Sequence, residues 1–148
     1  MWRRTFSSSK EKTKPSRVAE TGAVKMRAQG LAMEMRLSPT PLRLSQTRVI
    51  NVHVTVENVT KRLIHLNFPT SERLEILLSD EAGKTLVRWS DDRAVSPFPS
   101  YVSVNPGEKI EYNETLSTRD LSPGRPCTVI AFFPNFPHLT IKQTIIPE

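Results

Sequence analysis

The stretch Ile50-Asn51-Val52-His53-Val54-Thr55-Val56-Glu57 alternates apolar and polar residues at every position. Successive side chains of a β-strand point to opposite faces of the sheet, so this alternation is typical of a strand with one buried face. The apolar positions are filled by β-branched residues, which favour extended chain. We therefore expect a strand here, with its valines and Ile50 in the core.

The same period of two extends to both sides of this stretch. Residues 31–37 alternate in the same way and end at Ser38-Pro39-Thr40-Pro41. Because proline cannot donate to a sheet ladder, we expect the strand over 31–37 at a sheet edge. Residues 58–61 resemble a turn, which predicts a hairpin between residues 50–56 and 63–68. Further strands are expected near residues 74–78, 84–90, 101–104, 110–114, 128–133 and 139–145.

The connections decide how these strands pair. Asp80-Glu81-Ala82-Gly83 is a strong turn signal between two of them, which predicts a second hairpin. No segment has the apolar stripe of a helix, and parallel strands need long crossovers. We therefore predict an all-β fold, an antiparallel two-layer β-sandwich of about eight strands.

Positive charge is concentrated at the start of the chain. Residues 1–48 hold 11 Lys and Arg against three acidic residues, whereas residues 49–148 hold 10 against 12. Residues 1–30 also lack sustained periodicity, so we expect a basic, disordered tail over 1–30 and a folded domain over 31–148. An electrostatic tether, an organelle transit peptide and a later translation start remain open alternatives for the tail. The folded domain is mildly acidic, which argues against nucleic-acid binding.

Composition argues against several other classes of protein. No apolar run reaches the ~18 residues of a membrane helix, so no membrane span is expected. No secretory signal is visible, and a single cysteine, Cys127, excludes an intrachain disulfide and fits a reducing, cytoplasmic location. The glycosylation patterns at Asn58 and Asn113 are then without function.

We find no pattern that predicts catalysis, a metal or a cofactor. The expected hairpin would bring His53 and His65 together, but no third ligand has a matching spacing. Cys127 is interpreted as a small core residue, and Asp91-Asp92 as a solvated turn. A hydrolytic or metal-dependent enzyme would need converging histidines and acids, so we expect no enzyme.

Two proline-flanked aromatic loops are candidates for binding a protein partner. They are Ser96-Pro97-Phe98-Pro99-Ser100-Tyr101 and Phe132–His138. Proline reduces conformational freedom, so such a loop enters a binding site partly pre-organised. The alternative is that Phe98, Phe133 and Phe136 fold inward and cap the sandwich, and core packing is the default role of Trp89. The predicted partner-binding residues are Val95, Pro97, Phe98, Pro99 and Tyr101.

Three segments, in order, resemble the BsuPI domain, the intracellular proteinase inhibitor family. They are residues 52–71, containing Glu57-Asn58-Val59-Thr60 and Phe68-Pro69-Thr70-Ser71; residues 78–90, ending in Arg88-Trp89-Ser90; and residues 105–112, starting Asn105-Pro106-Gly107-Glu108. The resemblance covers about residues 48–146. The chain departs from the family at residues 74–76, Val87 and 124–127.

The resemblance implies an immunoglobulin-like sandwich that inhibits a cytoplasmic subtilisin-type serine proteinase. The resemblance does not identify a reactive loop in this chain. Our own candidate for the inhibitory loop is therefore residues 91–100, with Phe98 as the anchor. The alternative function is a structural or assembly adaptor that shares only the fold and pairs through the strand at residues 31–37.

Overall fold

Extended chain dominates the computed structural model, which describes residues 2–6 and 22–148. The predicted all-β, antiparallel fold is confirmed. The strands are β1 (Trp2–Phe6), β2 (Ala23–Ala28), β3 (Leu31–Ser38), β4 (Val49–Asn58), β5 (Ile64–Phe68), β6 (Glu75–Asp80), β7 (Thr85–Arg88), β8 (Ser100–Val104), β9 (Glu108–Ser117), β10 (Cys127–Phe133) and β11 (Phe136–Ile145). A short 3-10 helix, η1 (Trp89–Asp92), follows β7.

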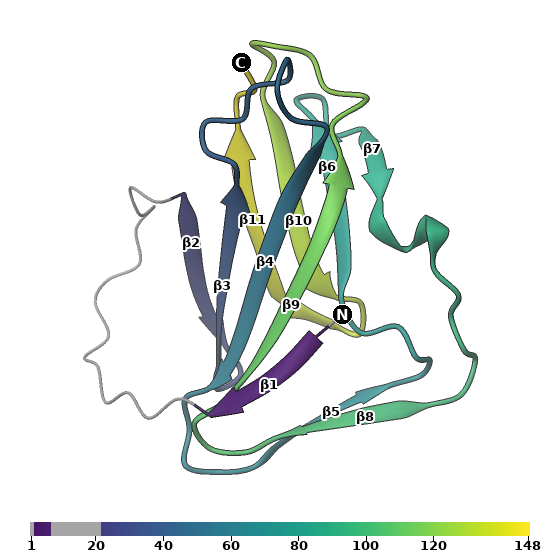
Figure 1. The fold of residues 1–148 in the computed structure, drawn as a ribbon. Helices are drawn as coiled ribbons and strands as arrows, with labels where there is room; N and C mark the ends of the chain where they lie inside the picture. The colour runs from purple at the N-terminus through teal and green to yellow at the C-terminus, as the bar shows by residue number, and fades with distance from the viewer. Residues whose placement is uncertain (1, 7–21) are drawn as a thin grey trace.

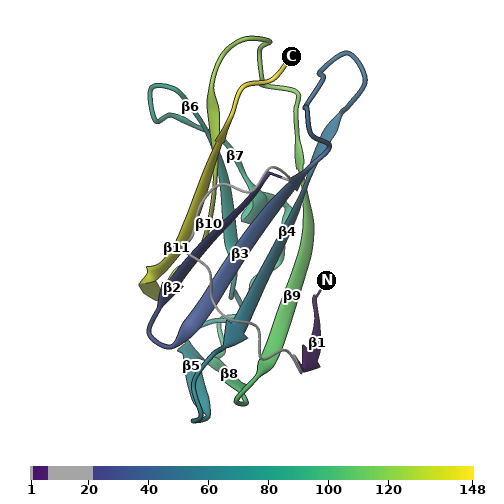
Figure 2. The same ribbon diagram turned by 90° about the vertical axis from the view of Figure 1, so that its left-hand side faces the viewer.

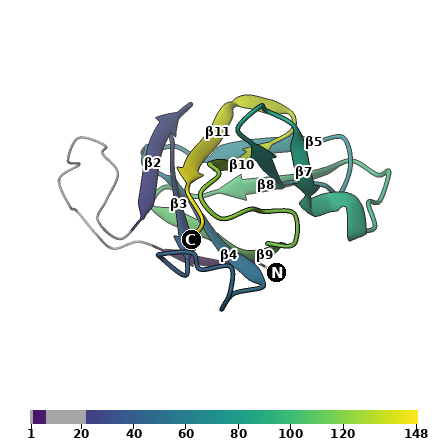
Figure 3. The same ribbon diagram turned by 90° about the horizontal axis from the view of Figure 1, so that it is seen from above.

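Two sheets enclose the core. One has the strand order β1-β9-β4-β3-β2 and the other has the order β11-β10-β6-β7. Figures 1 and 2 show both sheets from the side, with most strands running up and down the picture. Seen from above, the sheets lie on opposite sides of the interior (Figure 3). A two-stranded ribbon, β5-β8, runs across the lower end in Figure 1. The immunoglobulin-like class of this arrangement stays a prediction.

The core follows the alternation of the sequence. The apolar positions of β3 and β4 are buried, and Met35 lies opposite Val54 in their antiparallel register. Full burial of each such side chain contributes about 1.5–3 kcal/mol. Phe133 joins the sheets to the ribbon, since its ring centroid lies 6.0 Å from Phe68 and 6.1 Å from Tyr112.

The predicted edge position of the strand at 31–37 is wrong, and so is the tail boundary at residue 30. β2 pairs with β3 along residues 23–28 and becomes its outer neighbour. Gln29 and Gly30 turn the chain with φ angles of 53° and 80°, a geometry suited to a tight hairpin. The backbone of residues 2–6 pairs with β9, and residues 7–21 of the predicted tail lie outside the described residues.

Of the two predicted hairpins, one is confirmed and one is wrong. β6 and β7 pair across the Asp80–Gly83 turn, where Gly83 has a φ of 84°. β4 instead pairs with β3 and β9, and β5 pairs with β8. The chain leaves the large sheet at Asn58, so the turn that follows joins two different sheets.

Asn58 holds this exchange between sheets in place. Its fully buried amide nitrogen donates to the carbonyl oxygens of Arg62 and Val104, at 2.6 and 2.8 Å. Its side-chain oxygen accepts from the nitrogen and the hydroxyl of Thr60, at 2.9 and 2.7 Å. The backbone oxygen of Asn58 accepts from Gly107 at 2.9 Å. The residue therefore joins the turn after β4 to the end of β8 and the start of β9.

We predict that Asn58→Ala lowers the free energy of unfolding by about 3 kcal/mol, because it leaves buried backbone groups without partners. The measurement is urea denaturation followed by tryptophan fluorescence. The matched control is Asn113→Ala, at an exposed position of β9, which should change stability by less than about 0.5 kcal/mol. Equal stability of the two variants would contradict the role given to Asn58.

Candidate functional site

Residues 96–100 form an arch with both ends fixed to the segment after β5. At the first end, the Ser96 oxygen accepts from the Ser71 nitrogen at 3.0 Å, and the Ser96 nitrogen donates to the Ser71 hydroxyl at 2.7 Å. At the second end, the Ser100 hydroxyl donates to the Thr70 oxygen at 2.8 Å. Two adjacent residues thus hold the ends of the arch close together.

The tip of the arch consists of Pro97, Phe98 and Pro99, all exposed. The Phe98 side chain is 73% exposed, and Tyr101, just beyond the arch, is 68% exposed. Val95, on the other flank, is also exposed. The structure therefore brings all five predicted binding residues to the surface in one continuous segment. The inward-folding alternative does not apply to Phe98.

Two aromatic side chains of the second loop pack inward, although Pro134, Asn135, Pro137 and His138 are exposed. Phe133 is buried, and Phe136 packs against the core with its ring centroid 5.6 Å from that of Phe68. The inward-folding interpretation holds for these two residues. These two phenylalanines therefore cannot serve as exposed anchors for a partner.

A cluster of polar side chains fixes residues 89–95, the stem that leads into the arch. The Trp89 indole nitrogen donates to the Glu114 carboxylate on β9 at 3.2 Å. The Arg93 guanidinium lies 4.5 Å from the centre of the Trp89 ring and 3.5 Å from the same carboxylate. Trp89 thus packs against the core, as predicted, and also links η1 to the opposite sheet.

Glu75 fixes the start of the same stem from β6. Its buried carboxylate accepts from the backbone nitrogen of Ser90 at 3.2 Å and also from the Ser90 hydroxyl. The Arg88 guanidinium lies 3.7 Å away. Together with Glu114, Glu75 anchors both ends of η1 before the chain enters the arch.

Glu72 lies beside Glu75, one residue after the arch contact Ser71. Burial raises the pKa of Glu72, and a hydrogen bond with Glu75 and the negative charge of Glu75 raise it further, while Arg88 opposes the shift. A carboxyl whose pKa is higher in the folded state stabilises the fold at low pH, and this contribution is lost as pH rises through the folded pKa. Glu72 is therefore a source of instability at neutral pH.

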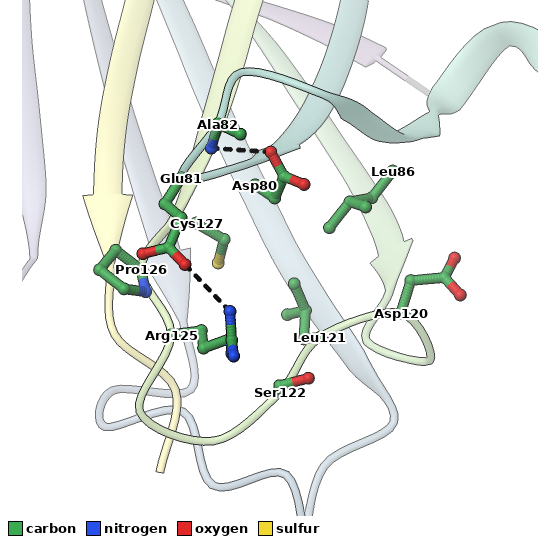
Figure 4. Close-up of a pocket in the computed structure, with 10 residues that line it drawn as sticks. All are labelled: Asp80, Glu81, Ala82, Leu86, Asp120, Leu121, Ser122, Arg125, Pro126 and Cys127. Atoms are coloured by element: carbon green, nitrogen blue, oxygen red, sulfur yellow. Dashed lines mark hydrogen bonds and ion pairs between the residues drawn. The ribbon is translucent and has the colours of Figure 1, made fainter.

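A shallow cavity of about 450 Å³ lies at the other end of the sandwich, between the β6-β7 turn and the loop after β9 (Figure 4). Three of its four charged residues, Asp80, Glu81 and Arg125, make local contacts. Arg125 pairs with Glu81 at 3.2 Å, and Asp80 accepts from two backbone nitrogens of its own turn. Cys127, buried as predicted, reaches the cavity wall, and burial raises its pKa to about 11. Such a thiol is a poor nucleophile at neutral pH.

His53 and His65 do not lie on neighbouring strands as expected, because β4 and β5 belong to different sheets. His53 lies 3.8 Å from Glu111, and the His65 ring is 2.8 Å from the Ser103 hydroxyl. Among residues 2–6 and 22–148, no cluster of three or more His, Cys, Asp or Glu residues could hold a metal ion. Within the same ranges, no helix has the length and apolar character needed to cross a membrane.

Sequence reasoning missed the residues that support the arch. Ser71 and Thr70 contact it across 25 and 30 positions of sequence, and Glu75 and Glu114 reach its stem from two different strands. No local pattern marks such contacts. The one available signal is the presence of Thr70 and Ser71 in the segment that resembles the family.

We predict that Glu72→Gln raises the urea midpoint at pH 7, because it removes a carboxylate held beside Glu75. The gain should shrink toward pH 4, where Glu72 is protonated in the native chain. The matched control is Asp120→Asn, at an exposed loop position, which should show no comparable gain. A gain that stays constant from pH 7 to pH 4 would refute the electrostatic cause.

Comparison with known families agrees with the geometry of the scaffold. A family described as BsuPI, intracellular proteinase inhibitor, matches residues 42–133. The match covers more than half of the chain and includes the arch, its stem and the Thr70-Ser71 pair. No curated protein matches the chain. The chain therefore belongs to the BsuPI family of intracellular proteinase inhibitors.

Proposed function

We propose that this chain inhibits a cytoplasmic subtilisin-type serine proteinase by inserting the arch of residues 96–100 into the active-site cleft. Phe98 would fill the pocket that accepts the side chain before the scissile bond. The description of the matching family, intracellular proteinase inhibitor, supports the inhibitory function. The sequence resemblance suggests the type of target. The observation that carries the assignment is the exposed Phe98 on an arch held at both ends.

The arch has the physical properties that an inhibitor needs. Its ends are fixed before binding, so little conformational entropy is lost when the proteinase closes around it. Large aromatic side chains that enter a pocket dominate many interfaces. The bond after Phe98 leads to the ring nitrogen of Pro99, which makes that bond a poor substrate. An inhibitor can tolerate this property, whereas a substrate cannot.

The adaptor alternative loses the surface on which it depended. The strand at residues 31–37 is paired on both sides, and Met33, Met35 and Leu37 are buried. An adaptor that pairs through this strand would first have to displace β2. The exposed arch therefore favours the inhibitor.

We predict that Phe98→Ala raises the inhibition constant for a subtilisin-type proteinase by about 30- to 1,000-fold, as expected for loss of about 2–4 kcal/mol at an anchor residue. The measurement is a titration of proteinase activity on a peptide substrate by the full chain. The matched control is Ile146→Ala, which removes another exposed apolar side chain outside the arch and should leave inhibition unchanged.

Two results would count against the assignment. Inhibition by the native chain that survives Phe98→Ala would move the contact to another surface. Absence of inhibition, with rapid cleavage within residues 96–100, would identify the arch as a substrate rather than an inhibitor.

A further inference from the structure

The two sides of Phe98 differ in what their backbone can offer a partner. Ser96, two residues before Phe98, uses both its nitrogen and its oxygen in bonds to Ser71, at 2.7 and 3.0 Å. A peptide that binds by strand addition needs such backbone groups to pair with the partner. The Ser96 nitrogen can donate to a partner only if its bond to Ser71 breaks.

The segment after Phe98 leads directly into the β5-β8 ribbon. The inward residues of this ribbon are buried, including Leu66, Phe68, Val102 and Val104. The opposite side, which we call the ribbon face, consists of His65, Asn67, Tyr101 and Ser103. In the strand register Asn67 lies opposite Tyr101 and His65 opposite Ser103. The ribbon face is thus presented by paired strands, next to the arch.

We infer that the ribbon face is a second contact surface for the proteinase, on the carboxyl-terminal side of Phe98. This inference rests on the proposed function. Tyr101 follows Phe98 by three positions, so their Cα atoms lie at most about 10 Å apart, and a proteinase that holds Phe98 in its pocket also covers the start of β8. The partner is therefore the proteinase itself, at the rim of its cleft.

Tyr101 is the residue expected to contribute most on this face. Its side chain is 68% exposed, although its strand is fixed by pairing with β5. Tyrosine gives a large contact area with little loss of side-chain entropy, and it is enriched at interface hot spots. Asn67, exposed on the neighbouring strand, places an amide beside it for a hydrogen bond at the edge of the contact.

The test compares Tyr101→Ala and Asn67→Ala with the native chain, with Phe98→Ala and with Thr115→Ala as an exposed strand control outside the ribbon. Inhibition constants and dissociation rates are measured against the same subtilisin-type proteinase, and thermal unfolding checks that each variant is folded. We expect Tyr101→Ala to raise the inhibition constant at least tenfold, mainly through faster dissociation. Asn67→Ala should raise it about threefold, and Thr115→Ala should have no effect.

The outcomes separate this inference from the proposed function. If Phe98→Ala weakens inhibition but Tyr101→Ala and Asn67→Ala match the native chain, the ribbon face is excluded and the proposed function stands. If the native chain does not inhibit, both fall.

Discussion

The buried amide of Asn58 is the contact on which the end of the molecule that carries the arch depends. By donating to Val104 it fixes the last residue of β8, while the Thr70 contact to Ser100 fixes the first. The arch and the ribbon face share this strand. Because both ends of β8 are held by polar contacts to turns, the position of Phe98 depends on hydrogen bonds more than on a hydrophobic anchor of its own.

Several polar residues of the segments that resemble the family close turns at the ends of strands. Asn58 and Thr60 close one turn, and the Glu108 carboxylate accepts from the backbone and side chain of Asn105 in another, at 2.9 and 3.0 Å. Thr70 and Ser71 hold the arch without entering its tip. Pro97, Phe98 and Pro99 lie outside these segments, so the scaffold and the choice of target can vary separately. Membership of the family therefore identifies the scaffold, and under the proposed function the tip would decide which proteinase fits.

The sequence predicted the strands better than their partners. Alternation identified β3 and β4 because it depends only on which face is buried, a local property. Pairing failed at β4 and β5 because a turn between neighbouring strands can also lead into another sheet. β2 was missed because Lys25 and Arg27 resemble a solvated tail, although Gln29-Gly30 marks a tight turn. The arch was one of two proline-flanked candidates, and its exposed tip could not be told from the inward-packed second loop by the prolines alone. The supports of the arch act across long separations in sequence.

The polar stem explains how a small β-domain can hold an exposed aromatic residue in place. Burying Glu75 and Glu114 costs desolvation energy, and apolar residues of similar size often stabilise a fold better. Here the two carboxylates bind Ser90, Trp89 and Arg93, which are the residues that lead the chain from β7 to the arch. Their benefit is therefore to the conformation of the stem rather than to the core. Glu72 is another carboxyl whose position lowers stability, because burial and the charge of Glu75 raise its pKa. It lies next to Ser71, the residue that holds Ser96. An inhibitor gains from this arrangement because a fixed loop binds tightly and resists cleavage.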